Sequence, residues 1–481
     1  MTHEPDQTRI RMTNTASHPN KTFPPGPPTP LFGLLLAQEL VANALGAVQR
    51  LQREHGDVLY FRILQESFYY LFSPEQIRTA IVERADDHIR HERAIDVFTQ
   101  IYGANVLTTE GEAWKRQRRI LMPGFLPKKV AGYLGLMTAA TNDNLASWFT
   151  QGKGESITID VGNFTRKVTV DVILRVLFSH QTSETDSFRA LEATLTLEHQ
   201  SMRELYWPKT PPDWMPYPGR TAKLRAKDVL QKLISDRIAV RRAGRASRSE
   251  GDDNTDYLAM LLSAQDDEAQ NKSAATLSND EIRDNCMVIF AAGHDTTATA
   301  LTWWIALMAQ HSEYASKVRQ EIAEVLGERM PAAEDFAKLN WLNATLKEAL
   351  RLYPPAPLLF VRRVTQDITL GEWTIPKGSN LSVPVWHVHH DARWFPEPDT
   401  FQPERFLPGA PDIPRGAYLP FGTGPRVCIG QHFAMMEMAL IAALLIRAFD
   451  FTPTDDAGMP KPKIAMVLQP ERALRINFTR R

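Results

Sequence analysis

The sequence predicts a mainly α-helical protein with a smaller β portion, in which residues 23–481 form a single large domain. Most segments from about 76 to 350 carry apolar residues at helical spacing. Stretches rich in β-branched and aromatic residues, which favour strands, occur at 58–72, 359–386 and 463–478. Neither an internal repeat nor a break in composition divides the chain, so one helical domain with small sheets is the simplest architecture.

The composition is that of a globular protein. Apolar residues make up 43% of the 481 residues and charged residues 23%. The formal net charge of -1 provides no basic field, which argues against a nucleic-acid partner. The clearest polar joint, 241–256, mixes Arg with Asp and therefore predicts a solvated loop between helices. Two cysteines are too few for a disulfide framework, which suits a reducing cytoplasm.

The N-terminal part divides into three short segments. Residues 1–22 are polar and charged, which predicts a disordered leader without the apolar core of a signal peptide. The prolines of 23–30 predict a stiff, extended entry to the domain. The apolar run 31–37 is too short to cross a bilayer. We therefore expect a cytoplasmic protein with no membrane anchor.

One of the two cysteines, Cys428, lies in the glycine-containing loop FGTGPRVCIG, 421–430, directly before an apolar helix predicted to start near 429–431. Glycines permit backbone conformations and close approaches that other residues do not. The helix N-terminus and Arg426 place positive charge beside the sulfur, which favours thiolate over thiol. Such a thiolate could serve as a nucleophile, a redox centre or a metal ligand.

The rest of the sequence offers little for the first two of these roles. A nucleophile needs an oriented base, and His432, one turn later, has no third group to orient it. Cys286 is remote and lies in a helical run, where we expect a small buried hydrophobe. A zinc site would have to use His387 and His389, expected on one face of a strand, where polar packing is the simpler interpretation. A single thiolate points to a metal that brings its other ligands along, as heme does.

The loop is similar to the cysteine signature of the cytochrome P-450 family at Phe421, Gly424, Arg426, Cys428 and Gly430. With the three motifs described below, the resemblance extends over essentially the whole chain from about residue 23. It implies the fold of that family, in which heme b lies between a long buried distal helix and the proximal helix after the cysteine loop. It also implies that Cys428 is the metal ligand, bound to the heme iron, and that O₂ is a co-substrate.

The predicted distal helix is apolar nearly all round and should run from about 279 to 310, because Ser278 and Glu281 have the spacing of a capping box. Its centre, AAGHDTT, puts polar residues inside this apolar rod. A kinked helix alone would explain them. The functional interpretation is that Gly293 opens room beside a ligand, with Thr296 holding dioxygen and Asp295 connecting to a proton supply. The family resemblance implies the same acid–alcohol pair, with Ala292 and Gly293 beside the heme, whereas His294 is expected to be structural.

Two further motifs place charges at helical spacing. Glu348 and Arg351 can face each other on a helix, and with Arg405 of PERF they resemble the family's Glu–Arg–Arg network, which would be buried and would fix the cysteine loop. The motif WKRQRR puts Trp114 and Arg118 on one helical face. The resemblance implies that heme propionates are held by Trp114, Arg118, Arg362 and Arg426. Basic residues near this motif are interpreted as a docking face for an acidic electron carrier: Lys115, Arg116, Arg119, Lys128 and Lys129.

The resemblance implies a heme-thiolate monooxygenase that hydroxylates or epoxidises a hydrophobic small molecule such as a fatty acid, terpenoid or steroid. Expected substrate contacts are Ala292, Thr296, Leu358 and Met466. Because no flavin domain follows Arg481, the electrons should come from a separate ferredoxin with its reductase rather than from a flavoprotein, and we expect a monomer. Two other classes stay open: a heme-thiolate sensor, which would not need Asp295 and Thr296, and a zinc-stabilised helical interaction protein.

Overall fold

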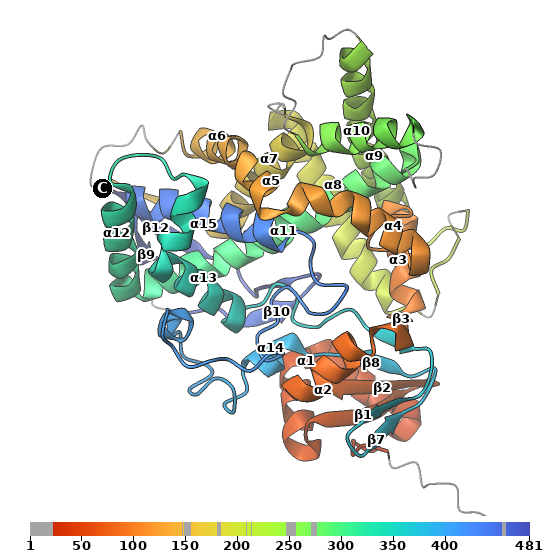
Figure 1. The fold of residues 1–481 in the computed structure, drawn as a ribbon. Helices are drawn as coiled ribbons and strands as arrows, with labels where there is room; N and C mark the ends of the chain where they lie inside the picture. The colour runs from red at the N-terminus through yellow and green to blue at the C-terminus, as the bar shows by residue number, and fades with distance from the viewer. Residues whose placement is uncertain are drawn as a thin grey trace, which may run out of the picture.

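In the computed structural model of the protein, the mainly helical prediction is confirmed. The structure describes residues 23–146, 148, 155–179, 184–207, 209–212, 214–246, 256–270, 277–454 and 458–481. The predicted leader, 1–22, lies outside the described residues. A β-rich part that includes the N-terminal strands packs below a larger helical part in the view of Figure 1.

The largest sheet has the strand order β1-β2-β8-β5-β3, so distant parts of the chain share it. Within 58–72, where the sequence predicts strands, β1 and β2 form a hairpin with Phe61 opposite Phe68 in antiparallel register. β2 pairs with β8 in parallel, and β5 runs antiparallel to both β8 and β3. The strands of this sheet are β1 (Val58–Ile63), β2 (Glu66–Leu71), β3 (His88–Arg90), β5 (Arg362–Val364) and β8 (Asn380–Ser382).

In the described part of the chain, three smaller sheets complete the β portion. One has the order β4-β12-β9, and the other two are the hairpins β6-β7 and β10-β11. Their strands are β4 (Ser156–Asp160), β6 (Ile368–Leu370), β7 (Trp373–Ile375), β9 (Phe449–Pro453), β10 (Pro462–Ile464), β11 (Leu468–Pro470) and β12 (Arg475–Arg480).

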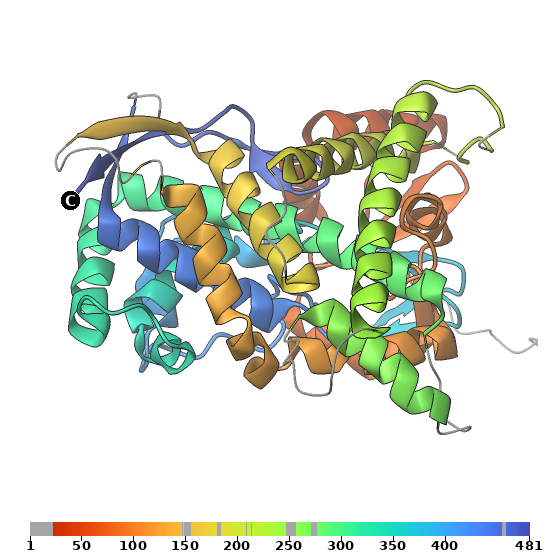
Figure 2. The same ribbon diagram turned by 90° about the horizontal axis from the view of Figure 1, so that it is seen from above.

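The helical part is arranged around α11, which runs through its middle in both ribbon views (Figures 1 and 2). α7 and α15 pack along α11, while α12 lies near one end and α9 and α10 lie near the other. The helices before α11 are α1 (Leu34–His55), α2 (Pro74–Arg78), α3 (Glu92–Tyr102), α4 (Gly111–Leu121), α5 (Pro127–Gly132), α6 (Leu134–Leu145), α7 (Val161–Phe178), α8 (Glu184–Leu205), α9 (Arg220–Ala246) and α10 (Tyr257–Gln270). The remaining helices are α11 (Asn279–Gln310), α12 (Ser312–Leu326), α13 (Asn340–Leu352), α14 (Val385–His389) and α15 (Gln431–Ala448).

The long helix α11 begins and ends where the sequence predicts. Ser278 Oγ accepts the N–H of Glu281 at 3.2 Å, and Glu281 Oε2 accepts the N–H of Ser278 at 2.8 Å, which completes the capping box. Between 282 and 309 the helix is buried except at Arg283 and at one central turn, which contains Ala292, Gly293 and Thr296. Such an all-round burial explains why a helix of this length carries so few charges.

Two local predictions were wrong. The polar joint does not begin at 241, because α9 continues to Ala246; Arg and Ala are good helix formers, and residues 247–255 lie outside the described part of the chain. WHVHHD does not form a strand either. Residues 386–389 lie in the short helix α14, which starts after Pro384 and ends at His389. His387, His389 and His390 each contact a backbone carbonyl oxygen through a ring nitrogen.

Among the described residues, two helices have the length and apolar composition that could cross a membrane. One comprises Pro30–His55, with a mean hydropathy of 1.7, and its window is 22% buried. The other is α15, whose window is 61% buried, as expected of a core helix. The apolar run 31–37 is thus followed without a break by a helix that extends to His55.

Candidate active site

The cysteine loop is held by its own backbone. The N–H of Cys428 donates to Phe421 O at 2.9 Å, and the N–H of Val427 donates to Gly424 O at 3.0 Å. Gly422 and Gly424 have φ values of +74° and +76°, which favour glycine. A Cβ on Gly424 would lie 2.6 Å from Ile81 O, so this glycine allows the loop to approach the neighbouring backbone. The loop therefore presents the cysteine from a fixed frame.

The sulfur of Cys428 is accessible, although protein atoms lie close to it. Its side chain is exposed, whereas Cys286 is buried, as the sequence predicts for a small hydrophobe. Neighbouring protein atoms nevertheless desolvate the Cys428 thiol in part and raise its pKa, while the Gly430 amide and the Arg118 cation lower it. The amide and the cation thus favour the thiolate, whereas desolvation opposes it. A metal ion at the sulfur would stabilise the thiolate further.

The accessible turn of α11 contains the predicted alcohol. Thr296 Oγ1 donates to Ala292 O at 2.8 Å, one turn back, as expected for a threonine inside a helix. Thr297 makes the same contact with Gly293 O at 3.0 Å. α15, which begins just after the cysteine loop, packs against α11. Leu358 is also accessible, with 37% of its surface exposed, and Met466 is half-buried.

Gly293 has a packing role that the sequence did not indicate. A Cβ at this position would lie 3.2 Å from Ile173 Cδ1 on α7, which is tighter than an ordinary contact. The absence of a side chain therefore lets α11 and α7 approach each other. This is a different reason for the glycine from the predicted one, which was room beside a ligand.

Asp295 is buried and has a charged partner. Arg166 Nε on α7 donates to Asp295 Oδ1 at 3.1 Å. The neighbouring His294 is also buried; its Nδ1 lies 2.9 Å from Phe290 O and its ring stacks on Phe290. These contacts agree with a structural histidine. Arg166 was missed because no local pattern links it to a residue 129 positions away.

The predicted propionate-binding residues form a cationic cluster around Trp114. The Arg426 guanidinium lies 3.8 Å from the centre of the Trp114 ring, and that of Arg118 lies 5.8 Å from it. Arg426 Nη1 donates to Thr109 O at 3.1 Å, and its Nη2 donates to Glu110. Arg118 Nη2 donates to Val427 O at 2.8 Å, beside the cysteine. The cluster therefore borders the cysteine loop directly.

A further cation, Arg90, belongs to this cluster and was missed. In the sheet it lies directly opposite Arg362, and both side chains are buried. Like charges facing each other across a strand pair are unfavourable unless an anion compensates them. Burial and then the neighbouring arginines lower the pKa of Arg90 to about 9, whereas Glu110 raises it. Burial also lowers the pKa of Arg426 to about 10.

The cluster is short of negative charge. Within the described part of the chain, the groups that shift these pKa values comprise four arginines around one carboxylate, Glu110. A group with two carboxylates would pair with them through charge-assisted hydrogen bonds. Heme b carries two such propionates, and with an accessible sulfur beside the cluster the residues present fit that cofactor.

Comparison with known proteins decides the family. The family model described as "Cytochrome P450" matches residues 24–478. The chain is 31% identical over 413 residues to "Putative cytochrome P450 132" of Mycobacterium tuberculosis, which covers 82% of this chain and 84% of that protein.

The chain belongs to the cytochrome P-450 family.

Plant members of the cytochrome P-450 family are similar to it at the same level. An "11-oxo-beta-amyrin 30-oxidase" of Glycyrrhiza uralensis is 29% identical over 412 residues, covering 83% of this chain and 76% of the relative. A "Cytokinin hydroxylase" of Arabidopsis thaliana is 32% identical over 382 residues, covering 78% and 72%. This P-450 is accordingly a monooxygenase that uses heme b and O₂ and requires a redox partner.

The Glu–Arg network of this P-450 is buried, as predicted. Arg351 donates to both carboxylate oxygens of Glu348, from Nε at 2.7 Å and from Nη2 at 2.8 Å, and neither side chain is exposed. Arg405 Nε lies 3.4 Å from Glu348 Oε1, an ion pair whose angle does not make a hydrogen bond. Arg351 Nη1 also donates to His389 O at 2.8 Å and to Pro398 O at 2.7 Å. The pair thus binds the backbone that leads to the cysteine loop.

The zinc alternative finds no support in this structure. Among the described residues, no group of three or more His, Cys, Asp or Glu side chains could hold a metal ion. His387 Nε2 contacts Leu45 O at 2.8 Å. His389 uses both ring nitrogens, toward Arg351 O at 3.1 Å and the N–H of Leu419 at 2.7 Å. These histidines connect elements of the fold.

Proposed function

We propose that this P-450 is a heme-thiolate enzyme in which Cys428 is the axial ligand and the substrate is a hydrophobic small molecule of the fatty acid, terpenoid or steroid class. One observation carries the proposal: the Cys428 sulfur is accessible and lies beside a cluster of four arginines. Among the described residues, Glu110 is the one carboxylate that shifts the pKa values of this cluster. Trp114, Arg118, Arg362, Arg426 and the added Arg90 would hold the propionates. The bound heme would supply oxygen activation.

The substrate proposal follows from the accessible apolar positions. Ala292, Thr296, Leu358 and Met466 are all at least partly accessible, and three of them are apolar. A hydrophobic molecule would gain about 25 cal/mol for each Å² of apolar surface that it buries against them. Two relatives are named as an oxidase of 11-oxo-beta-amyrin and a cytokinin hydroxylase, which supports hydroxylation as the reaction type.

Asp295 and Thr296 are proposed to manage protons. Thr296 Oγ1 is on the accessible turn and would hold dioxygen or its water by a hydrogen bond, while the buried Asp295 next to it would pass protons inward. Ala292 and Gly293 lie on the same turn and would border the cofactor. The contact of Arg166 with Asp295 fixes the position of the carboxylate.

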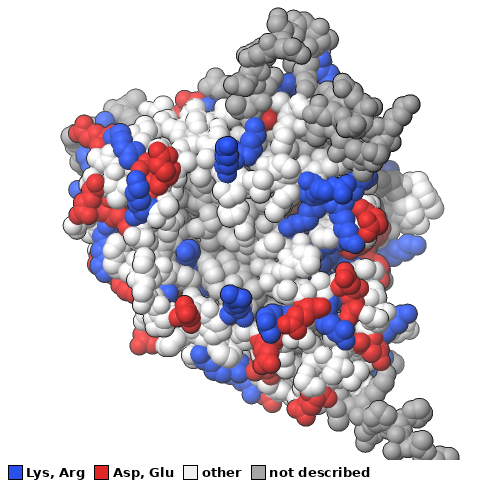
Figure 3. Space-filling view, in the orientation of Figure 1, with Lys and Arg blue, Asp and Glu red and all other residues white. Residues whose placement is uncertain are grey.

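A basic face is proposed to dock an acidic ferredoxin that works with a separate reductase, rather than a flavoprotein. Figure 3 shows Lys and Arg side chains gathered where α4 lies, with further basic side chains near α5. Lys115, Arg119 and Lys128 are exposed and Lys129 is half-buried. Arg116 instead pairs with Glu281 of the capping box, so we assign it to the fold rather than to docking.

We also propose that residues 23–481 act as one domain, that the protein is a cytoplasmic monomer, and that Pro30–His55 is not a membrane anchor. The second half of α1 supports this: Ala47, Val48 and Leu51 are buried, and Arg50 pairs with Glu39 and Glu54 along the helix. Fractionation of expressing cells tests it. Recovery of the protein in the high-speed supernatant without detergent is expected, and recovery only in the membrane pellet would contradict it.

Incorporation of isotope-labelled dioxygen tests the reaction. The purified protein, loaded with heme, is supplied with ferredoxin and reductase and with a panel of fatty acids, terpenoids and steroids. One labelled oxygen atom in a product that depends on ferredoxin is expected. Heme binding without any labelled product across the panel would favour the sensor alternative, and activity only with a flavoprotein donor would refute the ferredoxin assignment.

A further inference from the structure

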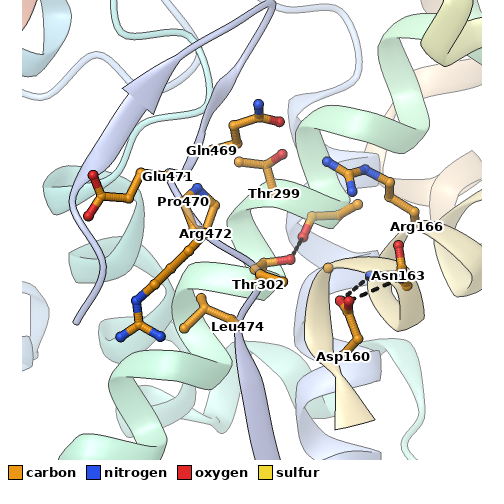
Figure 4. A pocket seen from close by; sticks show the side chains of 13 residues that line it. Asp160, Asn163, Arg166, Thr299, Thr302, Gln469, Pro470, Glu471, Arg472 and Leu474 are labelled. Carbon is orange, nitrogen blue, oxygen red and sulfur yellow. Dashed lines mark hydrogen bonds between the residues drawn. The ribbon is translucent and has the colours of Figure 1, made fainter. Parts of the chain in front are cut away.

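Two cations away from the cysteine loop each pair with one buried acid. Lys223 on α9 donates to Glu204 on α8 at 2.8 Å, and both side chains are buried. Arg166 on α7 donates to Asp295 at 3.1 Å and also lines an open polar pocket of about 220 Å³, where its side chain extends from the helix (Figure 4). Each of these cations is therefore balanced by a carboxylate of its own.

The arginine cluster beside the cysteine loop is balanced differently. Its four members are Arg90, Arg118, Arg362 and Arg426. Burial lowers the pKa values of Arg90, Arg362 and Arg426, and among the described residues Glu110 is the one carboxylate that opposes this. Because a single acid faces several like charges, its removal should have a larger effect than the loss of an ordinary surface acid.

Glu110 is held in place where α4 begins. It is the N-cap residue of α4 and has an extended backbone, but its side chain makes no capping hydrogen bond. The carboxylate instead accepts a hydrogen bond from Arg426 Nη2 and, at 3.3 Å, one from the backbone N–H of Arg90. Arg426 Nη1 donates to the carbonyl oxygen of the preceding residue, Thr109, at 3.1 Å. The start of α4 thus holds a carboxylate between two segments of the arginine cluster.

The contacts of Glu110 leave donors of the cluster for further anions. Arg90 Nη1 donates to Leu107 O, whereas Arg90 Nε is buried and has no hydrogen-bond partner among the described residues. A guanidinium carries five N–H donors in a planar fork. Arg426 therefore has enough donors to keep its contacts with Glu110 and Thr109 and to bind another carboxylate as well. Glu110 and a propionate can thus be neighbours in the cluster.

We propose that Glu110 is a permanent counter-ion of the arginine cluster, which stays on Arg426 when heme is bound and makes that heme harder to reduce. The inference rests on the proposed function, because it needs the propionates beside these arginines. One electron from the redox partner adds one negative charge to the heme, and the Glu110 carboxylate opposes this charge. Without heme, the same carboxylate limits the repulsion among the arginines. The Glu110 side chain is 29% exposed, so water screens both effects in part.

A redox titration of the heme-loaded protein tests the effect on reduction. Glu110→Gln keeps an oxygen acceptor for Arg426 and removes the charge. At a fixed solution potential the ratio of reduced to oxidised heme should increase about 3-fold, which is about 28 mV for a one-electron couple. Glu110→Asp, which retains the charge, should keep the unmodified ratio, and so should Glu112→Gln, which changes an 88% exposed acid paired with Lys115. An unchanged ratio in Glu110→Gln, or an equal increase in Glu110→Asp, would overturn the proposal.

Thermal unfolding of the heme-free protein tests the counter-ion role without the cofactor. Glu110→Gln should lower the unfolding temperature, because the arginines keep their mutual repulsion and lose the charge that offsets it. Glu112→Gln should leave the unfolding temperature unchanged. A Glu110→Gln variant as stable as the unmodified protein would overturn the counter-ion role. Failure of the protein to take up heme would refute the proposed function and the redox effect together, whereas the heme-free unfolding decides the counter-ion role separately.

Discussion

The N–H of Leu419 donates to His389 Nε2 at 2.7 Å, and this contact joins the buried Glu348–Arg351 pair to the cysteine loop. On the other side of the ring, His389 Nδ1 donates to Arg351 O at 3.1 Å, which fixes the tautomer. The ring also stacks on Tyr418, whose hydroxyl donates to Lys347 O at 3.0 Å. The predicted network thus reaches the loop through His389, which the sequence indicated only as part of a zinc site.

Replacing His389 should loosen the cysteine loop. We expect His389→Ala to reduce the fraction of protein purified with heme several-fold, because the Leu419 N–H loses its acceptor and a buried donor left unpaired costs about 1–3 kcal/mol. Heme-to-protein absorbance ratios measure this. His387→Ala is the matched control, since His387 contacts α1 rather than the loop, and equal losses in both variants would contradict the assigned link.

Breaking the buried ion pair between Glu348 and Arg351 should lower the free energy of unfolding more than the loss of a surface pair does. Arg351→Met leaves the buried Glu348 carboxylate with Arg405 and the N–H of Gln402 as its partners among the described residues, and removal of one partner of a buried pair typically costs about 3–5 kcal/mol. Urea unfolding of the purified protein measures the difference. The Lys317→Met variant removes the exposed ion pair between Lys317 and Glu404. It should change the free energy of unfolding far less. A similar cost for both variants would show that the Glu348–Arg351 pair is not the key contact.

Replacement of Arg90, which faces Arg362, should affect the heme-free and the heme-bound protein in opposite directions. Arg90→Met removes a repulsive neighbour of Arg362 and should stabilise the heme-free protein or leave it unchanged, while it should lower heme retention. Thermal unfolding of both forms measures this. Arg363→Met, on the adjacent position and paired with Glu66 and Glu92, should weaken both forms alike. Equal destabilisation of both forms by Arg90→Met would refute the propionate role.

Thr296 and Thr297 are neighbouring threonines with different accessibility. Thr296→Ala should divert O₂ into hydrogen peroxide, because the accessible hydroxyl would no longer direct protons, whereas Thr297→Ala removes a buried hydroxyl and should affect mainly stability. The ratio of peroxide to product measures the difference. Unchanged coupling in Thr296→Ala would count against its proposed role.

Mild acid should destabilise the fold through its buried histidines. Burial lowers the pKa of His387 and His88 to about 4 and that of His390 to about 3. Below the ordinary pKa of 6.5 the unfolded chain binds protons that the folded chain does not, so stability falls as the pH falls. Each such histidine contributes about 1.4 kcal/mol per pH unit in this range. Urea unfolding between pH 7 and 5 should show the slope, reduced in His390→Asn; a flat profile would contradict it.

Patterns of neighbouring residues predicted the exact bounds of some elements, but they did not predict contacts between distant parts of the chain. The capping box and the continuous apolar face of α11 are properties of adjacent residues, so its bounds were predictable. The contacts Arg90 with Arg362 and Arg166 with Asp295 join segments that only the folded chain brings together. Gly293 was recognised as unusual, but its neighbour Ile173 lies on another helix. The residues after Pro384 have a propensity for strands but form the short helix α14. Tertiary contacts of the histidines in this segment outweigh that strand propensity.

The reduced, carbon monoxide-bound absorption spectrum tests the central claim, that the accessible Cys428 sulfur binds heme iron. We predict a Soret band at the position diagnostic of thiolate ligation, lost in Cys428→Ala and retained in Cys286→Ala, whose thiol is buried in the core. A colourless protein, or a spectrum unchanged by Cys428→Ala, would contradict the account.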